Sequence, residues 1–278
     1  MIIPKSAETK LLLTILSLCL LFAASCEKGP DSETPVKSES SSLVVVAETI
    51  ADHNVVIVKP SEAKSGAPVV VVLTDDLLLT TRSSPVAEVP EVNFKAAEHC
   101  LIGGYTLCVV EVAAGEDLSF LTSLKESFTY ASKFYLLSYC NGLAYTAAMQ
   151  MPSEFAAFGC VSGTIEVEAY KANNFTQPVS FVHVHATENS VYRWTGVEGK
   201  SASVPLSVGA IVAIDECTHY TTGELIPRQG KGLVSYTKYL GGKNGHEVVL
   251  YSVDGKSNGW CDAEFEVYNQ IWNFFKNH

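Results

Sequence analysis

The chain has 278 residues, of which 47% are hydrophobic and 18% charged, and its formal net charge is −11 at pH 7. This length and apolar content suffice for one large α/β domain with a sizeable core. The negative charge argues against nucleic acid and anionic surfaces as partners.

The N-terminal segment 1–26 has the pattern of a bacterial secretion signal. Lys5 and Lys10 supply its basic region, and residues 11–22 form an apolar run that is too short to span a bilayer. The small residues directly before Cys26 resemble the bacterial lipobox, in which the cysteine becomes an acylated N-terminus. The pattern predicts export to the bacterial cell envelope, with lipid on Cys26 as the only membrane anchor. An ordinary signal peptide cleaved just before Cys26 is the alternative.

A polar segment, 27–41 (EKGPDSETPVKSESS), follows the predicted signal. It contains almost no large apolar side chain and cannot bury enough surface to order itself, so it is predicted to be a flexible tether. The remaining residues, 42–278, are predicted to form a single domain. The eight cysteines include no C-x-x-C pair and no His-Cys cluster at zinc spacing, so neither a metal site nor a cofactor is expected.

Within the domain, continuous apolar and β-branched runs alternate with helical patterns. Runs that are apolar throughout are typical of strands buried on both faces of a parallel sheet. Their alternation with helices indicates βαβ units, in which functional residues follow the carboxyl ends of strands. Residues 194–245 show the least clear pattern, and two stretches within them, WTGVEGKSASVPLSVGAIV (194–212) and TTGELIPRQGKG (221–232), are interpreted as loop and insertion. The expected strands are 44–47, 55–58, 69–73, 105–112, 134–137, 155–161, 179–185 and 248–253, and the expected helices are 93–99, 118–130, 142–151 and 263–276.

The stretch SYCNGLAYTAAM, residues 138–149, is predicted to be a strand that turns sharply into a helix. A nucleophile elbow requires small residues two positions before and after the nucleophile, because the turn is too tight for larger side chains. Ser138 and Gly142 meet this requirement on either side of Cys140. A helix that begins at Asn141 would favour the Cys140 thiolate through its N-terminal amides. The local pattern fits both a nucleophile and a buried cysteine in an ordinary turn.

Several sequence blocks, in order, resemble those of the polyhydroxybutyrate depolymerase and feruloyl esterase-like branch of the α/β-hydrolases. The resemblance covers most of residues 54–278, although 194–245 match poorly. It implies an α/β-hydrolase fold with a mostly parallel central sheet flanked by helices. The matching blocks are VVIVKPSEAKSGAPVVVVL, GEDLSFLTSLKES, KFYLLSYCNGLAYTAAMQMPSEFAAFGCVSG, PVSFVHVHATENSVYRW, EVVLYSVDGKSNGW and IWNFFKNH.

The catalytic residues of that family are all altered in this sequence. The family motif G-x-S-N-G matches SYCNG, which puts Cys140 in the nucleophile position. The H-G-T-x-D block matches HATEN and puts Asn189 in the acid position. The G-G-H-x-W block matches KSNGW and puts Asn258 in the position of the general base.

The oxyanion loop, which usually begins L-H-G in the family, reads Leu73-Thr74-Asp75 here. The resemblance therefore places the oxyanion region at Thr74, Asp75 and Asn141. A carboxylate on Asp75 would oppose the developing oxyanion if it pointed into the pocket.

These substitutions favour a catalytically degenerate pseudo-hydrolase with a binding or accessory role. A thiolate can accept an acyl group, but Asn258 cannot take a proton, and general acid-base help is worth about 10²–10⁴-fold in rate. The alternative is a cysteine esterase or thioesterase in which Cys140 recruits His185 or His219 as base. A third hypothesis is a purely structural surface lipoprotein without a ligand.

The resemblance suggests a small ester, a glycan or a polyester as ligand. Cys261 lies on the loop that carries the base in the family, so a Cys140–Cys261 disulfide, which would preclude catalysis, is a further alternative. Four aromatic residues near the inferred strand ends are candidates for stacking on a sugar or aryl ring, or are simply core residues: Tyr139, Tyr192, Trp194 and Trp260.

Overall fold

The computed structural model describes residues 43–62, 64–75, 81–82, 91–92, 94–113, 115–226, 232–255, 259 and 266–278. These residues belong to one unit, Ser41–His278. The predicted signal peptide, the tether and Cys26 lie outside the described residues, as do Asn258, Trp260 and Cys261. Within the described ranges, no helix combines the length and apolarity needed to cross a bilayer.

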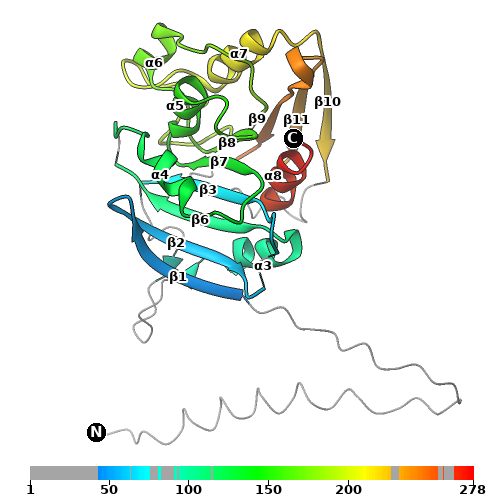
Figure 1. Ribbon diagram of the computed structural model, residues 1–278. Helices are drawn as coiled ribbons and strands as arrows, with labels where there is room; N and C mark the ends of the chain where they lie inside the picture. Colours follow the sequence, from blue (N-terminus) through cyan, green and yellow to red (C-terminus); the bar gives the residue numbers. More distant parts are fainter. Residues whose placement is uncertain are drawn as a thin grey trace, which may run out of the picture. The chain divides into compact units, whose positions relative to one another are not determined.

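The main sheet consists of β1 (Leu43–Ile50), β2 (His53–Pro60), β3 (Val69–Thr74), β6 (Thr106–Glu111), β7 (Phe134–Tyr139), β8 (Ala157–Val161), β9 (Phe181–Ala186), β10 (His219–Leu225), β11 (Val234–Leu240) and β12 (Val248–Val253). Its strand order is β1-β2-β6-β3-β7-β8-β9-β12-β11-β10 (Figure 1). The strands from β6 to β12 in this order pair in parallel, as predicted. Both edges of the sheet are antiparallel. A separate pair is formed by β4 (Thr81–Arg82) and β5 (Glu91–Val92).

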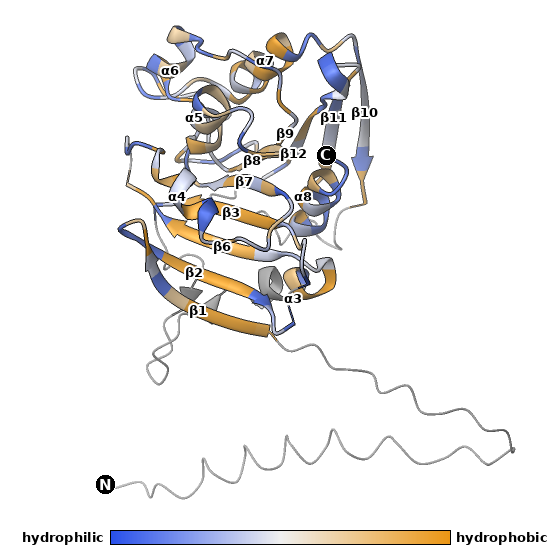
Figure 2. Cartoon of the chain, in the orientation of Figure 1, coloured by the Kyte–Doolittle hydropathy of each residue, from blue (hydrophilic) through white to orange (hydrophobic). Residues whose placement is uncertain are grey.

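The described helices are α3 (Phe94–Gly103), α4 (Phe120–Glu126), α5 (Leu143–Gln150), α6 (Val167–Ala172), α7 (Val204–Asp215), α8 (Val267–Phe275) and the 3₁₀ turn η1 (Lys243–Gly245). They cover both faces of the sheet and divide the core in two. In β3, Val69 and Val71 pack with residues of α4, α5 and α7, whereas Val70 packs with residues of α3 and α8. All six side chains of β3 are buried, and Figure 2 shows the apolar central strands between the helices. This two-sided burial explains the continuous apolar runs.

The interpretation of residues 194–212 and 221–232 as loop and insertion is wrong in part. Most of α7 lies in the first stretch and much of β10 in the second, and with β11, which follows them, β10 extends the sheet. The sequence of α7, VPLSVGAIVAID, is apolar on nearly every side, so no polar face marks a helical period. The residues of β10 and β11 are mostly exposed or half-buried, and these strands lack the apolar runs of the sheet centre.

Candidate functional site

The predicted strand-turn-helix is present at the carboxyl edge of the sheet. Strand β7 ends at Tyr139, Cys140 has φ +56°, and α5 begins at Leu143 after Gly142 as its N-cap. The Cys140 amide donates to the carbonyl of Val161 at 2.9 Å, which fixes the turn against β8. A left-handed φ in a residue with a side chain stores about 1–3 kcal/mol of strain, and such strain is concentrated at functional sites. Cys140 therefore has the backbone geometry of an elbow nucleophile.

Two glycines allow the elbow to approach the loop after β8. A Cβ on Gly142 would lie 2.1 Å from the carbonyl oxygen of Thr164. A Cβ on Gly163 would lie 1.8 Å from the carbonyl oxygen of Asn141. Since both contacts are with backbone atoms, neither position tolerates a larger residue without a shift of the main chain.

The predicted oxyanion region lies between β3 and the elbow. The Asn141 side chain donates from Nδ2 to the carbonyl of Leu73 at 3.3 Å and accepts at Oδ1 from the amide of Leu143 at 3.1 Å. Thr74 is buried, whereas Asp75 is exposed and lines the pocket beside the elbow. The carboxylate of Asp75 is thus on the pocket side of the strand end.

Asn189, in the acid position, is buried, and its amide has a defined orientation. Its Oδ1 accepts hydrogen bonds from the backbone amides of Val191 and Tyr192, both at 2.9 Å. Its Nδ2 is buried and has no acceptor within the described part of the chain. The Oδ1 atom is thus occupied by the two backbone amides, and the remaining polar group of the side chain, Nδ2, is a hydrogen-bond donor. In a catalytic triad, the carboxylate at this position must instead accept a hydrogen bond from the N–H of the base.

The two histidines of β9 form a buried chain of hydrogen bonds with Tyr145. His185 Nε2 lies 2.7 Å from the carbonyl oxygen of Tyr192, which can only accept, so this nitrogen carries the proton. His185 Nδ1 therefore accepts from Nε2 of His183 at 3.2 Å, and Nδ1 of His183 accepts from the Tyr145 hydroxyl at 2.7 Å. Burial lowers the pKa of both histidines. Both ring nitrogens of His185 are thus engaged, and neither can take a proton from Cys140.

The second recruited base of the alternative hypothesis, His219, does not approach the elbow. It begins β10, at the amino end of that strand, whereas the elbow lies at the carboxyl end of β7. Five strand spacings separate β7 from β10, which corresponds to roughly 24 Å at about 4.8 Å per strand. The prediction that His219 could serve as base is therefore wrong.

The aromatic candidates lie in different surroundings. Tyr192 is half-buried and lines the pocket. Tyr139 is 5% exposed and packs in the core on the side of α8, so the structure does not bring it to the pocket. Trp194 is half-buried, with its ring against His185 at a centroid distance of 6.2 Å, and is not among the residues that line the pocket. Trp260 lies outside the described residues, so its proposed role stays a prediction.

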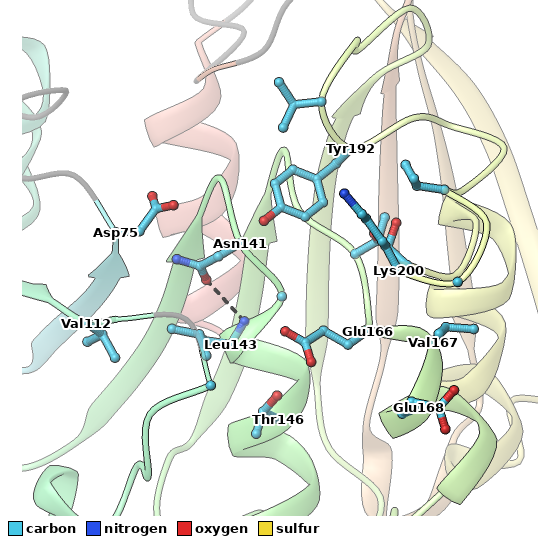
Figure 3. A pocket seen from close by; sticks show the side chains of 17 residues that line it. Asp75, Val112, Asn141, Leu143, Thr146, Glu166, Val167, Glu168, Tyr192 and Lys200 are labelled. Carbon is cyan, nitrogen blue, oxygen red and sulfur yellow. Dashed lines mark hydrogen bonds between the residues drawn. The ribbon is translucent and has the colours of Figure 1, made fainter.

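A pocket of about 540 Å³ opens beside the elbow (Figure 3). This volume suits a small organic ligand. Burial raises the pKa of Tyr192 to about 12, and the charge of the Asp75 carboxylate acts in the same direction. The pocket is lined by Asp75, Val112, Gly115, Asn141, Gly142, Leu143, Thr146, Thr164, Glu166, Val167, Glu168, Val191, Tyr192, Val197, Gly199, Lys200 and Ser201.

Several polar residues of this wall were not predicted. Thr164 and Glu166 follow the carboxyl end of β8, so the rule that sites follow strand ends could have identified them. Lys200 and Ser201 belong to the region interpreted as insertion, and no sequence signal pointed to them. Within the described ranges, no three His, Cys, Asp or Glu side chains are grouped so as to hold a metal ion.

No family model and no curated protein matches the sequence. Among solved structures, an esterase from Pyrococcus furiosus is similar with a TM-score of 0.50 over 91% of this chain and 99% of the esterase, at 11% identity. A prolyl endopeptidase is similar with a TM-score of 0.51 over 88% of this chain and 39% of the endopeptidase, at 9% identity. A candidate dipeptidyl aminopeptidase IV from Bacteroides ovatus is similar with a TM-score of 0.53 over 86% of this chain and 36% of the peptidase, at 10% identity. The chain thus spans less than half the length of the two peptidases. It has the α/β fold of the α/β-hydrolases, with a mostly parallel mixed sheet flanked by helices.

Proposed function

We propose that this chain is an exported, lipid-anchored relative of polyhydroxybutyrate depolymerases and feruloyl esterases that binds a ligand without hydrolysing it. The orientation of the Asn189 amide is the observation that carries this proposal. Its oxygen accepts from two backbone amides, and its buried Nδ2 offers a donor where a histidine base needs an acceptor. The same Asp-to-Asn change in a serine protease triad lowers kcat by about 10⁴.

The surroundings of Cys140 support the same proposal. His185 uses both ring nitrogens in the buried hydrogen-bond chain. The carboxylate of Asp75 lines the pocket where an oxyanion would develop, and negative charge there opposes acyl transfer. The pocket itself has the size of a small-molecule site.

The full chain is expected to hydrolyse p-nitrophenyl acetate and methyl ferulate no faster than its Cys140→Ala variant, because the amides of Asn189 and Asn258 in the acid and base positions cannot take a proton. Initial rates of both proteins, measured side by side, check this expectation. Cys217→Ala is the matched control, since Cys217 is half-buried and precedes β10, far from the elbow. A rate that falls at least 100-fold in Cys140→Ala but not in Cys217→Ala would contradict the proposal.

A cysteine esterase or thioesterase is the second candidate function. The observation in its favour is the elbow itself, since Cys140 keeps the left-handed φ of +56° and the close glycine contacts around it. Combined Asn189→Asp and Asn258→His substitutions test how much of the site remains. Hydrolysis that appears only in this double variant would favour the non-hydrolytic function, because the elbow would then be intact and only the acid and base would be missing in the wild type. Hydrolysis by the wild type itself that is lost in Cys140→Ala would favour the cysteine esterase.

The location of the protein depends on Cys26. In a bacterial host, the full chain is expected to sediment with membranes, and Cys26→Ser is expected to move it to the soluble fraction, because one change removes the acylated residue. Cys19→Ser is the matched control, since Cys19 lies within the apolar run. Membrane association that persists in Cys26→Ser would contradict the lipid anchor.

A further inference from the structure

The pocket carries more negative than positive side chains. Three carboxylates line it, from Asp75, Glu166 and Glu168, against the one ammonium of Lys200. Glu168 is paired with Lys171 at 2.7 Å. Across the described residues, neither Asp75 nor Glu166 forms an ion pair. Within the part of the chain that the structure describes, two carboxylates of the wall therefore have no cationic partner.

These two carboxylates line the same pocket as Tyr192. Asp75 follows β3, Glu166 precedes α6, and Tyr192 lies in the loop after β9, so three separate elements supply them. Figure 3 shows the three side chains around the same hollow. Burial raises the pKa of the Tyr192 hydroxyl, and the negative charges of Asp75 and Glu166 act in the same direction.

Buried hydroxyl groups lie in the same wall. Thr164 Oγ1 and Ser201 Oγ are buried, and neither has a hydrogen-bond partner among the described residues. A buried polar atom without a partner destabilises the folded state, because it has given up its hydrogen bonds to water. The rest of the wall is apolar and includes Leu143, Val191 and Val197.

We propose that this pocket binds a primary ammonium group on a small apolar body, with the ammonium between Asp75 and Glu166 and against Tyr192. Carboxylates accept charge-assisted hydrogen bonds from an ammonium, and an aromatic face attracts a cation within about 6 Å. The concave wall concentrates the negative field and repels anions. The proposal deepens the proposed function and rests on it, because it names the chemistry of the ligand that is bound but not hydrolysed.

Benzylamine and benzyl alcohol form a matched pair of probes, since they share shape and ring and differ in charge at pH 7. Titration calorimetry on the full chain in detergent is expected to show benzylammonium binding at least tenfold more tightly than benzyl alcohol at low salt. The preference is expected to shrink at 0.5 M NaCl, because salt screens the carboxylates.

Three variants locate the interaction. Glu166→Gln is expected to abolish the preference for the amine, whereas Glu168→Gln, the matched control, keeps it within twofold because Glu168 already has a cationic partner. Lys200→Met is expected to tighten amine binding by removing the competing cation. Circular dichroism of each variant verifies the fold.

Two results would overturn the proposal: equal binding of benzyl alcohol and benzylamine, or an amine preference that survives Glu166→Gln in a folded protein. Neither result depends on catalysis. Turnover of esters by Cys140 would instead refute the proposed function while leaving the charge preference of the pocket to be judged by the titrations.

Discussion

Replacing Gly163 with alanine is expected to destabilise the fold by about 3 kcal/mol or more, the largest effect we expect from a single methyl group. The new Cβ would lie 1.8 Å from the carbonyl oxygen of Asn141 and 2.4 Å from its carbonyl carbon. Real Cβ atoms essentially never approach other atoms closer than 3.0 Å. The main chain of the elbow must therefore move away from the loop after β8.

That movement disrupts further contacts. The Asn141 carbonyl oxygen also accepts hydrogen bonds from Ser138 Oγ at 3.1 Å and from Cys160 Sγ at 3.4 Å. Both donors are buried and would be left without this acceptor. The free energy of unfolding, measured by urea titration with circular dichroism, reports the loss.

Gly209→Ala is the matched control. Gly209 lies within α7, and a Cβ there would meet nothing within 4 Å. Alanine is preferred over glycine inside a helix by about 1 kcal/mol, so this variant is expected to be as stable as the wild type or slightly more stable. A Gly163→Ala protein within 1 kcal/mol of the wild type would show that the elbow and the β8 loop do not touch as described.

The central strands were predictable because each is buried on both faces. β3 reads VVVVLT and β9 reads FVHVHA, and no residue of either is exposed. The same rule could not identify α7, whose apolar residues cover nearly all its sides, or β10, which is mostly exposed. The hydrophobic pattern thus predicts a strand or helix when its side chains are buried in a regular period or throughout. It does not predict an element that is apolar on all sides without a period, or one that is mostly exposed.

The candidate site was predictable only in part. The elbow follows from spacing, because a tight turn requires small neighbours around Cys140. Strand alternation could have excluded Tyr139, since Tyr135, Leu137 and Tyr139 share the face of β7 that packs toward α8. Glu166 and Lys200 come from loops that only the tertiary fold brings to the pocket, so no period in the sequence could have paired them with Tyr192.

The stability of the protein is expected to fall as the pH drops below about 6.5, because His183 and His185 are buried as neutral rings. Burial lowers the pKa of each histidine below its ordinary value in the folded state. The unfolded chain takes up a proton near pH 6.5 at each position, whereas the folded chain takes it up only at a lower pH. Each histidine therefore removes up to about 1.4 kcal/mol of unfolding free energy per pH unit below that point, for as long as its folded form stays neutral.

Asp215 has the opposite effect on the pH dependence of stability. Burial raises its pKa from 3.8 to about 7, so between these values the folded state holds a proton that the unfolded state lacks. Its contribution to stability therefore increases as the pH falls through 7, by about 1.4 kcal/mol per unit. Its Oδ1 accepts from the amide of Val179 at 2.8 Å, and its Oδ2 is buried without a partner among the described residues.

The two effects are separated by comparing the wild type with Asp215→Asn between pH 6.5 and 5. These three groups predict a loss of up to about 1.4 kcal/mol per pH unit in the wild type and up to about 2.7 kcal/mol per pH unit in the variant, since two histidines then act without an opposing carboxyl. Urea titrations at each pH give the slopes, and contributions from all other groups cancel in their difference. His183→Gln is expected to reduce the wild-type slope by about 1.4 kcal/mol per pH unit. Parallel curves for the wild type and both variants would mean that these buried side chains do not titrate as their surroundings indicate.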